Sequence, residues 1–238
     1  MAGAGTSFTQ AGYTFPKPLV DVNGKPMIQV VIENLKPKLS HKFIFLAQKE
    51  HFEKYSLHEI LKNSVKEEFE VIQLSKLPQG AACTVLAAIE FINNDSELII
   101  VNSDQVIDVK LDDFIAFARK SNADGVIMTF ESGHPRWSYV RLNKKGEVIE
   151  TAEKKVISNM ATVGIYYFRQ GKLFVESAFN MLEKDIRINN EFYVCPVYNE
   201  MILTGKKVYN WHIKQKQMHG LGTPEDLNNY LALTKKKK

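Results

Sequence analysis

Cysteine is scarce in this chain, and its scarcity excludes one class of proteins. Cys83 and Cys195 are the two cysteines among 238 residues, and they lie far apart with no metal-ligand spacing. Small secreted domains instead carry many cysteines that pair into a disulfide framework. The sequence therefore predicts two free thiols in a cytoplasmic protein.

Long hydrophobic runs are also absent. No apolar stretch reaches the roughly 18–20 residues that a membrane-spanning helix needs. The first residues do not show a basic segment followed by an apolar one, which is the pattern of a secretory signal. We therefore expect neither a membrane span nor secretion.

A strong charge of one sign is missing once the terminal lysines are set aside. The formal net charge is +4, and the run Lys235-Lys236-Lys237-Lys238 closes the sequence. Such a run is ordinarily a frayed, solvated end. The nearly neutral remainder gives no indication of a nucleic-acid partner.

What is present is an ordinary globular composition, with 45% hydrophobic, 24% charged and 11% aromatic residues. A chain of this length builds one large domain or two small ones. We find no internal repeat, linker or low-complexity segment. The sequence therefore favours a single domain over 1–238, with two halves at 1–124 and 125–234.

The first half alternates strands and helices. Apolar runs predict strands over 42–47, 69–74 and 97–102. The 3.6-residue periodicity predicts helices over 26–35, where Pro26 is the first residue, and over 51–63, 84–92 and 111–120. This order is typical of a doubly wound, mostly parallel α/β sheet.

The second half does not alternate strands and helices regularly. It predicts strands over 125–130, 161–168 and 207–213, a hairpin of 139–143 with 148–151, and helices over 172–184 and 224–233. Thr223 is the expected N-cap of the last helix, with Pro224 as its first residue. A mixed sheet is the expected result.

A glycine-rich loop opens the chain and organises the rest. Gly3, Gly5 and Gly12 are followed by Phe15-Pro16-Lys17-Pro18-Leu19. Glycine lets backbone N–H groups approach a ligand closely, and successive N–H groups form a concavity that binds anions. Lys17, between two prolines that restrict its backbone, adds a point charge. The pattern indicates a phosphate site.

Asp104 is the expected metal ligand. It follows the apolar strand 97–102, and open α/β sheets bind ligands at the carboxyl ends of their strands. Mg²⁺ is usually held by one or two carboxylates together with substrate phosphates. A strand-ending Asx turn is the structural alternative.

These motifs resemble the nucleotidyltransferase (nucleotide-sugar pyrophosphorylase) family, whose opening reads G-x-G-[ST]-R, about ten residues, then P-K-P-[LM]. The strongest matching segments are GAGTSF, FPKPL and GLGTPEDL. The resemblance implies the Rossmann-like fold of nucleotide-diphospho-sugar transferases. It also implies a nucleotide-binding first half and an acceptor-binding second half.

The resemblance also implies roles for individual residues. Lys17 is the catalytic lysine, and Asp104 holds Mg²⁺. The nucleotide is bound by Ala2, Gly3, Ala4, Gly5, Thr6, Ser7, Gln79, Gly80 and Ser103. Gln79 and Gly80 are expected to read a pyrimidine edge. The acceptor is contacted by Tyr139, Glu153, Lys154 and Gly164.

The sequence departs from the family pattern at several positions. Ser7 replaces an arginine, which removes a charge and a bidentate donor. Gly220 stands where many members have a second metal-binding aspartate, and Val140 replaces a glycine after Tyr139. No apolar run precedes Gly3, so we expect the inner strand that the family has there to be missing, with a lower stability as the result.

The resemblance implies transfer of a nucleotide from an NTP to a phosphorylated acceptor, such as a sugar 1-phosphate, with release of pyrophosphate. The segment 11–35 looks most like members grouped with capsule and lipopolysaccharide biosynthesis. Two alternatives are a glycosyltransferase of the same fold and a non-catalytic nucleotide-binding paralogue. Asn102 at the first place of an Asp-x-Asp motif weighs against the former. The oligomeric state is left open.

Overall fold

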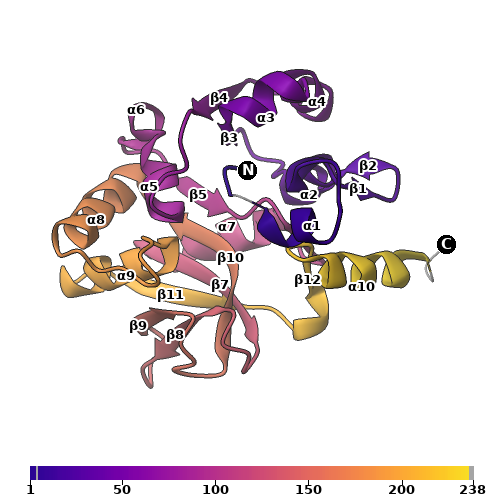
Figure 1. Cartoon of the computed structure of the whole chain (residues 1–238). Coiled ribbons are helices and arrows are strands. Elements are labelled where there is room, and N and C mark those ends of the chain that lie inside the picture. The colour runs from indigo at the N-terminus through magenta and orange to yellow at the C-terminus, as the bar shows by residue number, and fades with distance from the viewer. Residues whose placement is uncertain (4, 236–238) are drawn as a thin grey trace. The chain divides into compact units, whose positions relative to one another are not determined.

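The computed structural model describes residues 1–3 and 5–235. The chain forms two compact units that interleave along the sequence (Figure 1). Unit 1 comprises Met1–Leu77, Asn102–Leu111 and Lys216–Lys238, and unit 2 comprises Pro78–Val101 and Asp112–Gln215. The division of a single domain at residue 124 stays a prediction.

Unit 1 holds three small pairs of strands. β3 (Phe43–Gln48) and β4 (Phe69–Leu74) are parallel, whereas β6 (Gln105–Ile107) pairs antiparallel with β12 (Met218–Gly220). The third pair is β1 (Asp21–Val22) with β2 (Lys25–Pro26). The helices and 3-10 turns are α1 (Thr6–Gln10), η1 (Lys17–Leu19), α2 (Met27–Leu35), α3 (Lys49–Lys54), α4 (Leu57–Ser64), η2 (Gln215–Gln217, at the unit boundary) and α10 (Pro224–Lys235).

The core of unit 1 lies between α2, α4 and the β3–β4 pair. Ile28 and Ile32 of α2 are buried there with Leu57 and Leu61 of α4 and with Phe45 of β3. The 3.6-residue spacing of the apolar positions puts them on one face of each helix. Among the described residues of unit 1, α1 is the first helix or strand in the sequence. The strand β3 pairs with β4 along one of its two edges.

Unit 2 is built on a mixed sheet. The strand order is β11 (Val208–His212), β7 (Gly125–Glu131), β10 (Met160–Phe168), β8 (Ser138–Leu142) and β9 (Val148–Glu153), and β5 (Leu98–Val101) also pairs with β10. β7 and β11 are parallel, and the other pairs are antiparallel. Because β10 pairs antiparallel with three strands, the parallel share is smaller than the sequence indicated.

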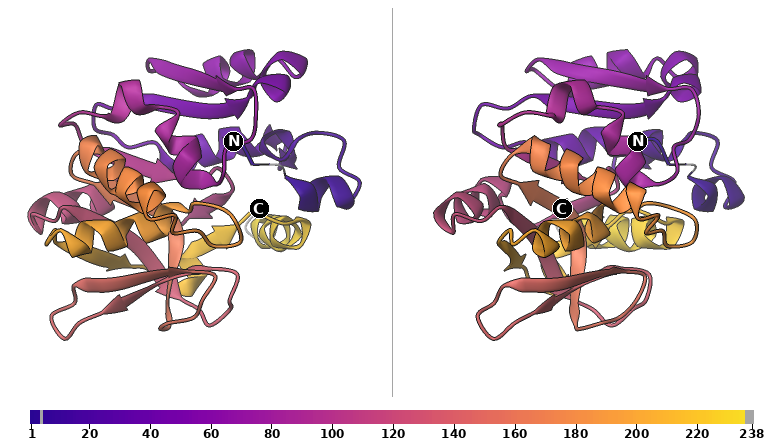
Figure 2. Two further views of the ribbon diagram at one scale, coloured as in Figure 1. Left: turned by 60° about the vertical axis from the view of Figure 1, so that its left-hand side comes forward. Right: turned by 90° about the vertical axis from the view of Figure 1, so that its left-hand side faces the viewer.

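Helices cover this sheet. They are α5 (Ala81–Leu86), α6 (Ile89–Ile92), α7 (Leu111–Lys120), α8 (Gly171–Glu183) and α9 (Val194–Leu203). α8 and α9 lie side by side (Figure 2). The ring of Tyr198 on α9 stacks on Phe168 of β10, with the centroids 4.6 Å apart. Large apolar side chains thus fill unit 2 from both sequence halves.

Most predicted elements are present, and two predicted helices are interrupted. The helix expected over 51–63 divides at Ser56, whose φ of 48° is left-handed. The helix expected over 84–92 begins earlier, at Ala81, and divides at Ala87 and Ala88. The bounds of α1 and α9 were not predicted. Among the described helices, none is long and apolar enough for a membrane span.

Candidate functional site

The glycine loop leads directly into α1. Gly5 has a φ of +63°, which glycine adopts without strain, and its carbonyl accepts from Phe8 N at 3.1 Å. Thr6 and Ser7 occupy the first turn, where the N–H groups have no acceptor within the helix. Buried Phe8 anchors the turn. These amides are thus available to an anion.

The strand residue Gln48 fixes the residues before this turn. Its Nε2 donates to the carbonyl oxygens of Ala2 at 3.2 Å and Gly3 at 2.9 Å. The side chain of Ala2 is buried, and a Cβ placed on Gly3 would have no neighbour within 4 Å. The site prediction for Ala4 lies outside the described residues.

Lys17 and Asp104, predicted as site residues from distant parts of the sequence, form an ion pair. The Lys17 ammonium donates to Asp104 Oδ2, and the side chains are 23% and 24% exposed. The 3-10 turn η1, with Pro18 buried beneath it, sets the direction of Lys17. Ser103, half-buried, precedes Asp104. Both charges belong to unit 1.

Backbone contacts place the Leu221-Gly222 segment beside this ion pair. Leu221 N–H donates to the carbonyl of Asp104 at 2.7 Å, next to the β6–β12 ladder. A Cβ on Gly222 would lie 3.1 Å from Asp104 Oδ2 and 3.8 Å from Lys17 Nζ. Glycine at 222 therefore leaves room at the carboxylate that a side chain would fill.

Gly220 lies close to another carboxylate. A Cβ on Gly220 would be 3.5 Å from Cγ of Asp226. Thr223 Oγ1 accepts from Asp226 N at 3.2 Å and donates to Asp226 Oδ2 at 2.8 Å, so Thr223 caps α10 and the Asp226 carboxylate orients its hydroxyl. The predicted N-cap role of Thr223 is confirmed. The sequence analysis predicted no role for Asp226.

His219 has a structural contact. Its Nε2 lies 2.9 Å from Asp108 Oδ2, and its ring lies 5.6 Å from that of Tyr230. These contacts connect β12 with α10 and with the end of β6. They brace the strand that precedes Gly222.

In unit 2, the loop of Gln79 and Gly80 is held by a segment far along the chain. Phe192 N donates to Gln79 O at 2.8 Å, and Ala82 N donates to Phe192 O at 2.9 Å. Gly80 has a φ of +105°, and a Cβ there would lie 2.6 Å from Phe192 N. Only glycine fits this conformation and this close approach.

Glu153 is a buried acid at the end of β9. It is 9% exposed, and Ser138 Oγ donates to its Oε2. Burial raises the pKa of Glu153 above its ordinary value, although the Ser138 hydrogen bond and the Lys154 charge lower it. The neighbouring Tyr166 is fully buried, and desolvation raises its pKa. Glu153 therefore binds a proton more readily than an exposed glutamate does, and it lies beside the hydroxyl groups of Ser138 and Tyr166.

The remaining predicted acceptor residues differ in accessibility. Lys154 is exposed with a φ of 52°, and its Nζ donates to the hydroxyl of Tyr193 at 2.6 Å. Gly164, with a φ of +88°, lies at the register shift of β10. Tyr139 is fully buried and donates to His134 O at 2.7 Å. Tyr139 therefore packs in the core, and its contact with the acceptor stays a prediction.

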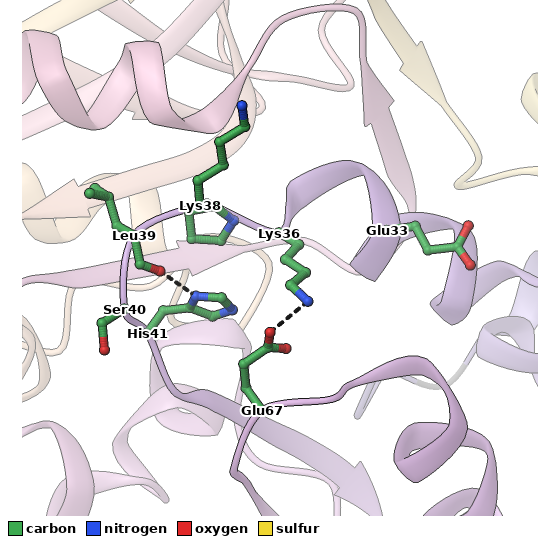
Figure 3. Close-up of a pocket in the computed structure, with 8 residues that line it drawn as sticks. Glu33, Lys36, Lys38, Leu39, Ser40, His41 and Glu67 are labelled. Atoms are coloured by element: carbon green, nitrogen blue, oxygen red, sulfur yellow. Dashed lines mark hydrogen bonds and ion pairs between the residues drawn. The ribbon is translucent and has the colours of Figure 1, made fainter.

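Unit 1 also has a pocket of about 390 Å³, which is lined by residues other than those described above (Figure 3). Lys36 and Glu67 form an ion pair at 2.6 Å within it, and His41 Nδ1 lies 2.7 Å from Leu39 O. None of its lining residues is a predicted site residue. The pocket therefore contributes nothing to the site described above.

A family comparison matches almost the whole chain. The model of the nucleotidyl transferase family covers residues 1–230. The chain belongs to the nucleotidyl transferase family. This result confirms the family and enzyme class predicted from the glycine loop and the Pro16-Lys17-Pro18 segment.

Curated relatives of this nucleotidyl transferase are distant. It is 26% identical over 170 residues to the bifunctional protein GlmU of Methanococcus maripaludis, which covers 69% of this chain and 38% of that protein. It is 29% identical over 182 residues to the mannose-1-phosphate guanyltransferase of Yarrowia lipolytica, covering 70% and 47%. The chain thus spans less than half the length of these two relatives.

Solved structures support the fold of this nucleotidyl transferase. The nucleoside-diphosphate-sugar pyrophosphorylase from Vibrio cholerae superposes with a TM-score of 0.85 at 23% identity, covering 98% of each chain. UDP-glucose pyrophosphorylase complexed with UDP-glucose gives 0.79 at 17% identity, covering 99% and 96%. The predicted α/β fold with a mixed central sheet is confirmed.

Proposed function

We propose that this chain transfers a nucleotidyl group from an NTP to a phosphorylated acceptor and releases pyrophosphate. The observation that carries the proposal is the Lys17–Asp104 ion pair beside Gly222, in the same unit as the glycine loop. Membership of the nucleotidyl transferase family supports the same reaction class.

The residues of unit 1 suit the handling of phosphates. The amides of Thr6 and Ser7, in the first turn of α1, offer donors to phosphate oxygens. The Lys17 ammonium is a fixed positive charge that neutralises the growing negative charge on the α-phosphate. The acceptor phosphate oxygen forms a bond to the α-phosphorus as the bond to the β-phosphate oxygen breaks. Pyrophosphate leaves with that electron pair, and no protein nucleophile is needed.

Magnesium is the proposed metal ion, as the resemblance of the Asp104 segment to the family implies. The donor set of unit 1 fits it, because Asp104 supplies a hard oxygen and Gly222 leaves free space beside that oxygen. Among the described residues, no group of three or more potential ligand side chains exists, which suits an ion held mainly by substrate phosphates. Asp104 would hold Mg²⁺, which supplies charge neutralisation for the phosphates.

The acceptor is proposed to contact Glu153 and Lys154 of unit 2. A carboxylate accepts from sugar hydroxyl groups, and the exposed ammonium of Lys154 suits a phosphate. The name of the relative mannose-1-phosphate guanyltransferase includes a sugar 1-phosphate, which supports a sugar 1-phosphate here. A cytoplasmic role in capsule or lipopolysaccharide assembly is part of this proposal and rests on the resemblance of segment 11–35.

Pyrophosphate release with each NTP and a panel of sugar 1-phosphates tests the function. We expect Mg²⁺-dependent release that Lys17→Ala lowers by about 10²–10³-fold, the usual cost of one transition-state donor. An unchanged melting temperature for Lys17→Ala shows that the loss is chemical. Release of NDP from an NDP-sugar would instead identify a glycosyltransferase, and NTP binding without turnover would identify a non-catalytic paralogue.

A further inference from the structure

The first hairpin of unit 1 turns on Asn23 and Gly24. These two residues join β1 to β2, and their φ angles of 55° and +87° are both left-handed. A two-residue turn with positive φ at both positions is the type I′ turn that Asn-Gly favours. The sequence contains no other Asn-Gly step, and both residues are exposed.

An asparagine followed by glycine loses its side-chain amide more readily than other asparagines do. The backbone nitrogen of Gly24 forms a bond to Asn23 Cγ, the Cγ–Nδ2 bond breaks, and Nδ2 leaves as ammonia with the proton of the Gly24 amide. Water then opens the imide ring to aspartate or isoaspartate. Glycine does not shield the attacking nitrogen, and a Cβ placed on Gly24 would have no neighbour within 4 Å.

The proton that must leave the Gly24 nitrogen already faces a carboxylate. Gly24 N–H lies 3.1 Å from Asp21 Oδ2 and 3.3 Å from Asp21 Oδ1. A carboxylate accepts protons and has no donor of its own when ionised. Asp21 is therefore placed to take this proton and pass it to the departing ammonia.

The Asn23 amide is held away from this reaction by the last helix. Asn23 Nδ2 donates to Thr234 Oγ1 at 2.9 Å. The Thr234 hydroxyl lies 3.1 Å from the carbonyl oxygens of Tyr230 and Leu231, so its proton is used within α10 and its oxygen is left to accept. Closing the imide ring requires the Asn23 side chain to lie over Gly24 N instead of reaching α10. Both partners belong to unit 1.

The backbone of the hairpin is a weak restraint by comparison. Its ladder consists of the pairs Asp21 with Pro26 and Val22 with Lys25. A two-stranded hairpin is marginally stable by itself, and local opening of so short a ladder costs little. The contact between Asn23 and Thr234 is therefore the principal restraint on the amide.

We propose that Asn23 is a site of spontaneous deamidation whose rate is set by its hydrogen bond to Thr234. The product has a new carboxylate close to that of Asp21, and Thr234 loses its donor. Isoaspartate also adds one carbon atom to the main chain, so the pairing of Asp21 with Pro26 cannot be kept. This inference does not depend on the proposed function.

Mass spectrometry of peptides tests the proposal by following Asn23 while the folded protein is incubated at neutral pH. Thr234→Val keeps the shape and removes the acceptor, so conversion should be about 3–10-fold faster than in the wild type, the value of one hydrogen bond. Thr234→Ser keeps the hydroxyl and should convert at the wild-type rate.

Two controls accompany these variants. Thr204→Val is the matched substitution, because the Thr204 hydroxyl bonds to two carbonyls of α9 as that of Thr234 does in α10, and it should leave the rate at Asn23 unchanged. Asn122 is an internal reference, since it is exposed with a φ of 51° but is followed by Ala123. It should convert far more slowly than Asn23.

Three results would overturn the proposal. Equal rates at Asn23 in the wild type and Thr234→Val would show that the contact does not restrain the amide. Conversion of Asn122 as fast as that of Asn23 would show that the turn has no special reactivity. Conversion of Asn23 in guanidinium but in no folded variant would show that the backbone alone protects it. If Thr234→Val lowers the melting temperature, the ratio of the rates at Asn23 and Asn122 decides, because general unfolding accelerates both.

Discussion

β10 in unit 2 and β3 in unit 1 show how differently the two units are built. β10 pairs with three strands, and all its residues except Met160 are buried. β3 pairs with β4 alone among the described strands, and only Phe45 and Ala47 of its six residues are buried. Side-chain burial therefore contributes much more to the structure of unit 2.

The difference matters because the two units carry different candidate chemistry. Unit 1 presents its groups on turns: the first turn of α1, the 3-10 turn with Lys17, and the segment around Gly222. Unit 2 presents Glu153 from a buried position of the strand β9, whose other positions alternate in exposure. The proposed phosphate contacts thus depend on the close approach of backbone segments, whereas the proposed acceptor contact at Glu153 depends on the packing of a sheet.

The largest effect on stability is expected when one phenylalanine ring of each unit is truncated to alanine, and the two losses are compared. Phe168→Ala removes a fully buried ring stacked on Tyr198 and should lower the free energy of unfolding by about 3–5 kcal/mol. Phe43→Ala removes a half-buried ring of β3, so about 1–2 kcal/mol is expected.

Separate probes follow the two units in this experiment. Trp137 and Trp211 are both in unit 2, so tryptophan fluorescence reports its unfolding, and hydrogen exchange of the Phe45 amide reports unit 1. Equal losses for Phe168→Ala and Phe43→Ala would contradict the contrast in burial.

A smaller effect is expected at Gly222. In Gly222→Ala the new Cβ lies 3.1 Å from Asp104 Oδ2, so the carboxylate and Lys17 must shift. The shift that the Cβ requires is a few tenths of an ångström. This is less than the 1 Å misplacement that can cost about 10²-fold, so we expect kcat/KM to fall by about 3–10-fold. Gly133→Ala is the control, because its Cβ would have no neighbour within 4 Å. A full loss of folding, seen by circular dichroism, would mean that Gly222 is needed for structure rather than for space at Asp104.

The smallest effect is expected at Glu153. Its pKa is raised by burial, so the folded state binds the proton more tightly than the unfolded state. The stabilisation from the protonated form is complete below the ordinary value of 4.5 and is lost as the pH rises through the folded-state pKa. Glu153→Gln removes this loss, and its melting temperature should exceed that of the wild type by a few degrees at pH 7.

The pH series provides the control for this prediction. The advantage of Glu153→Gln should vanish below pH 4.5, where the wild-type carboxyl is protonated in both states. Glu150→Gln, at an exposed position of the same strand, should show no such advantage. A melting temperature for Glu153→Gln below that of the wild type at pH 7 would mean that the Ser138 contact outweighs the cost of burying the charge.

Sequence periodicity located most of the fold. β4 and α7 have the predicted bounds, and α10 begins at Pro224 after the predicted cap Thr223. Errors occurred where a local backbone feature interrupts a regular pattern, as at Ser56 between α3 and α4. The burial of the Tyr139 ring was not predicted, because a family position does not tell whether a side chain points into the core.

The segment of residues 185–193 was missed for a physical reason. It has no regular period, and its Asp185, Asn189 and Asn190, all with positive φ, are residue types that indicate turns. Its role arises from contacts with Gln79 and Gly80, more than a hundred positions earlier. Such contacts have no local signature.

The sequence by itself determined the family, the glycine loop and the residue types that suit phosphate chemistry, because these are encoded in short motifs. The tertiary structure alone decided that Asp104 pairs with Lys17, that Asn23 bonds to Thr234, and that Gly222 leaves space at the carboxylate. Each of these depends on residues distant in sequence, and their side chains meet only when the chain has folded.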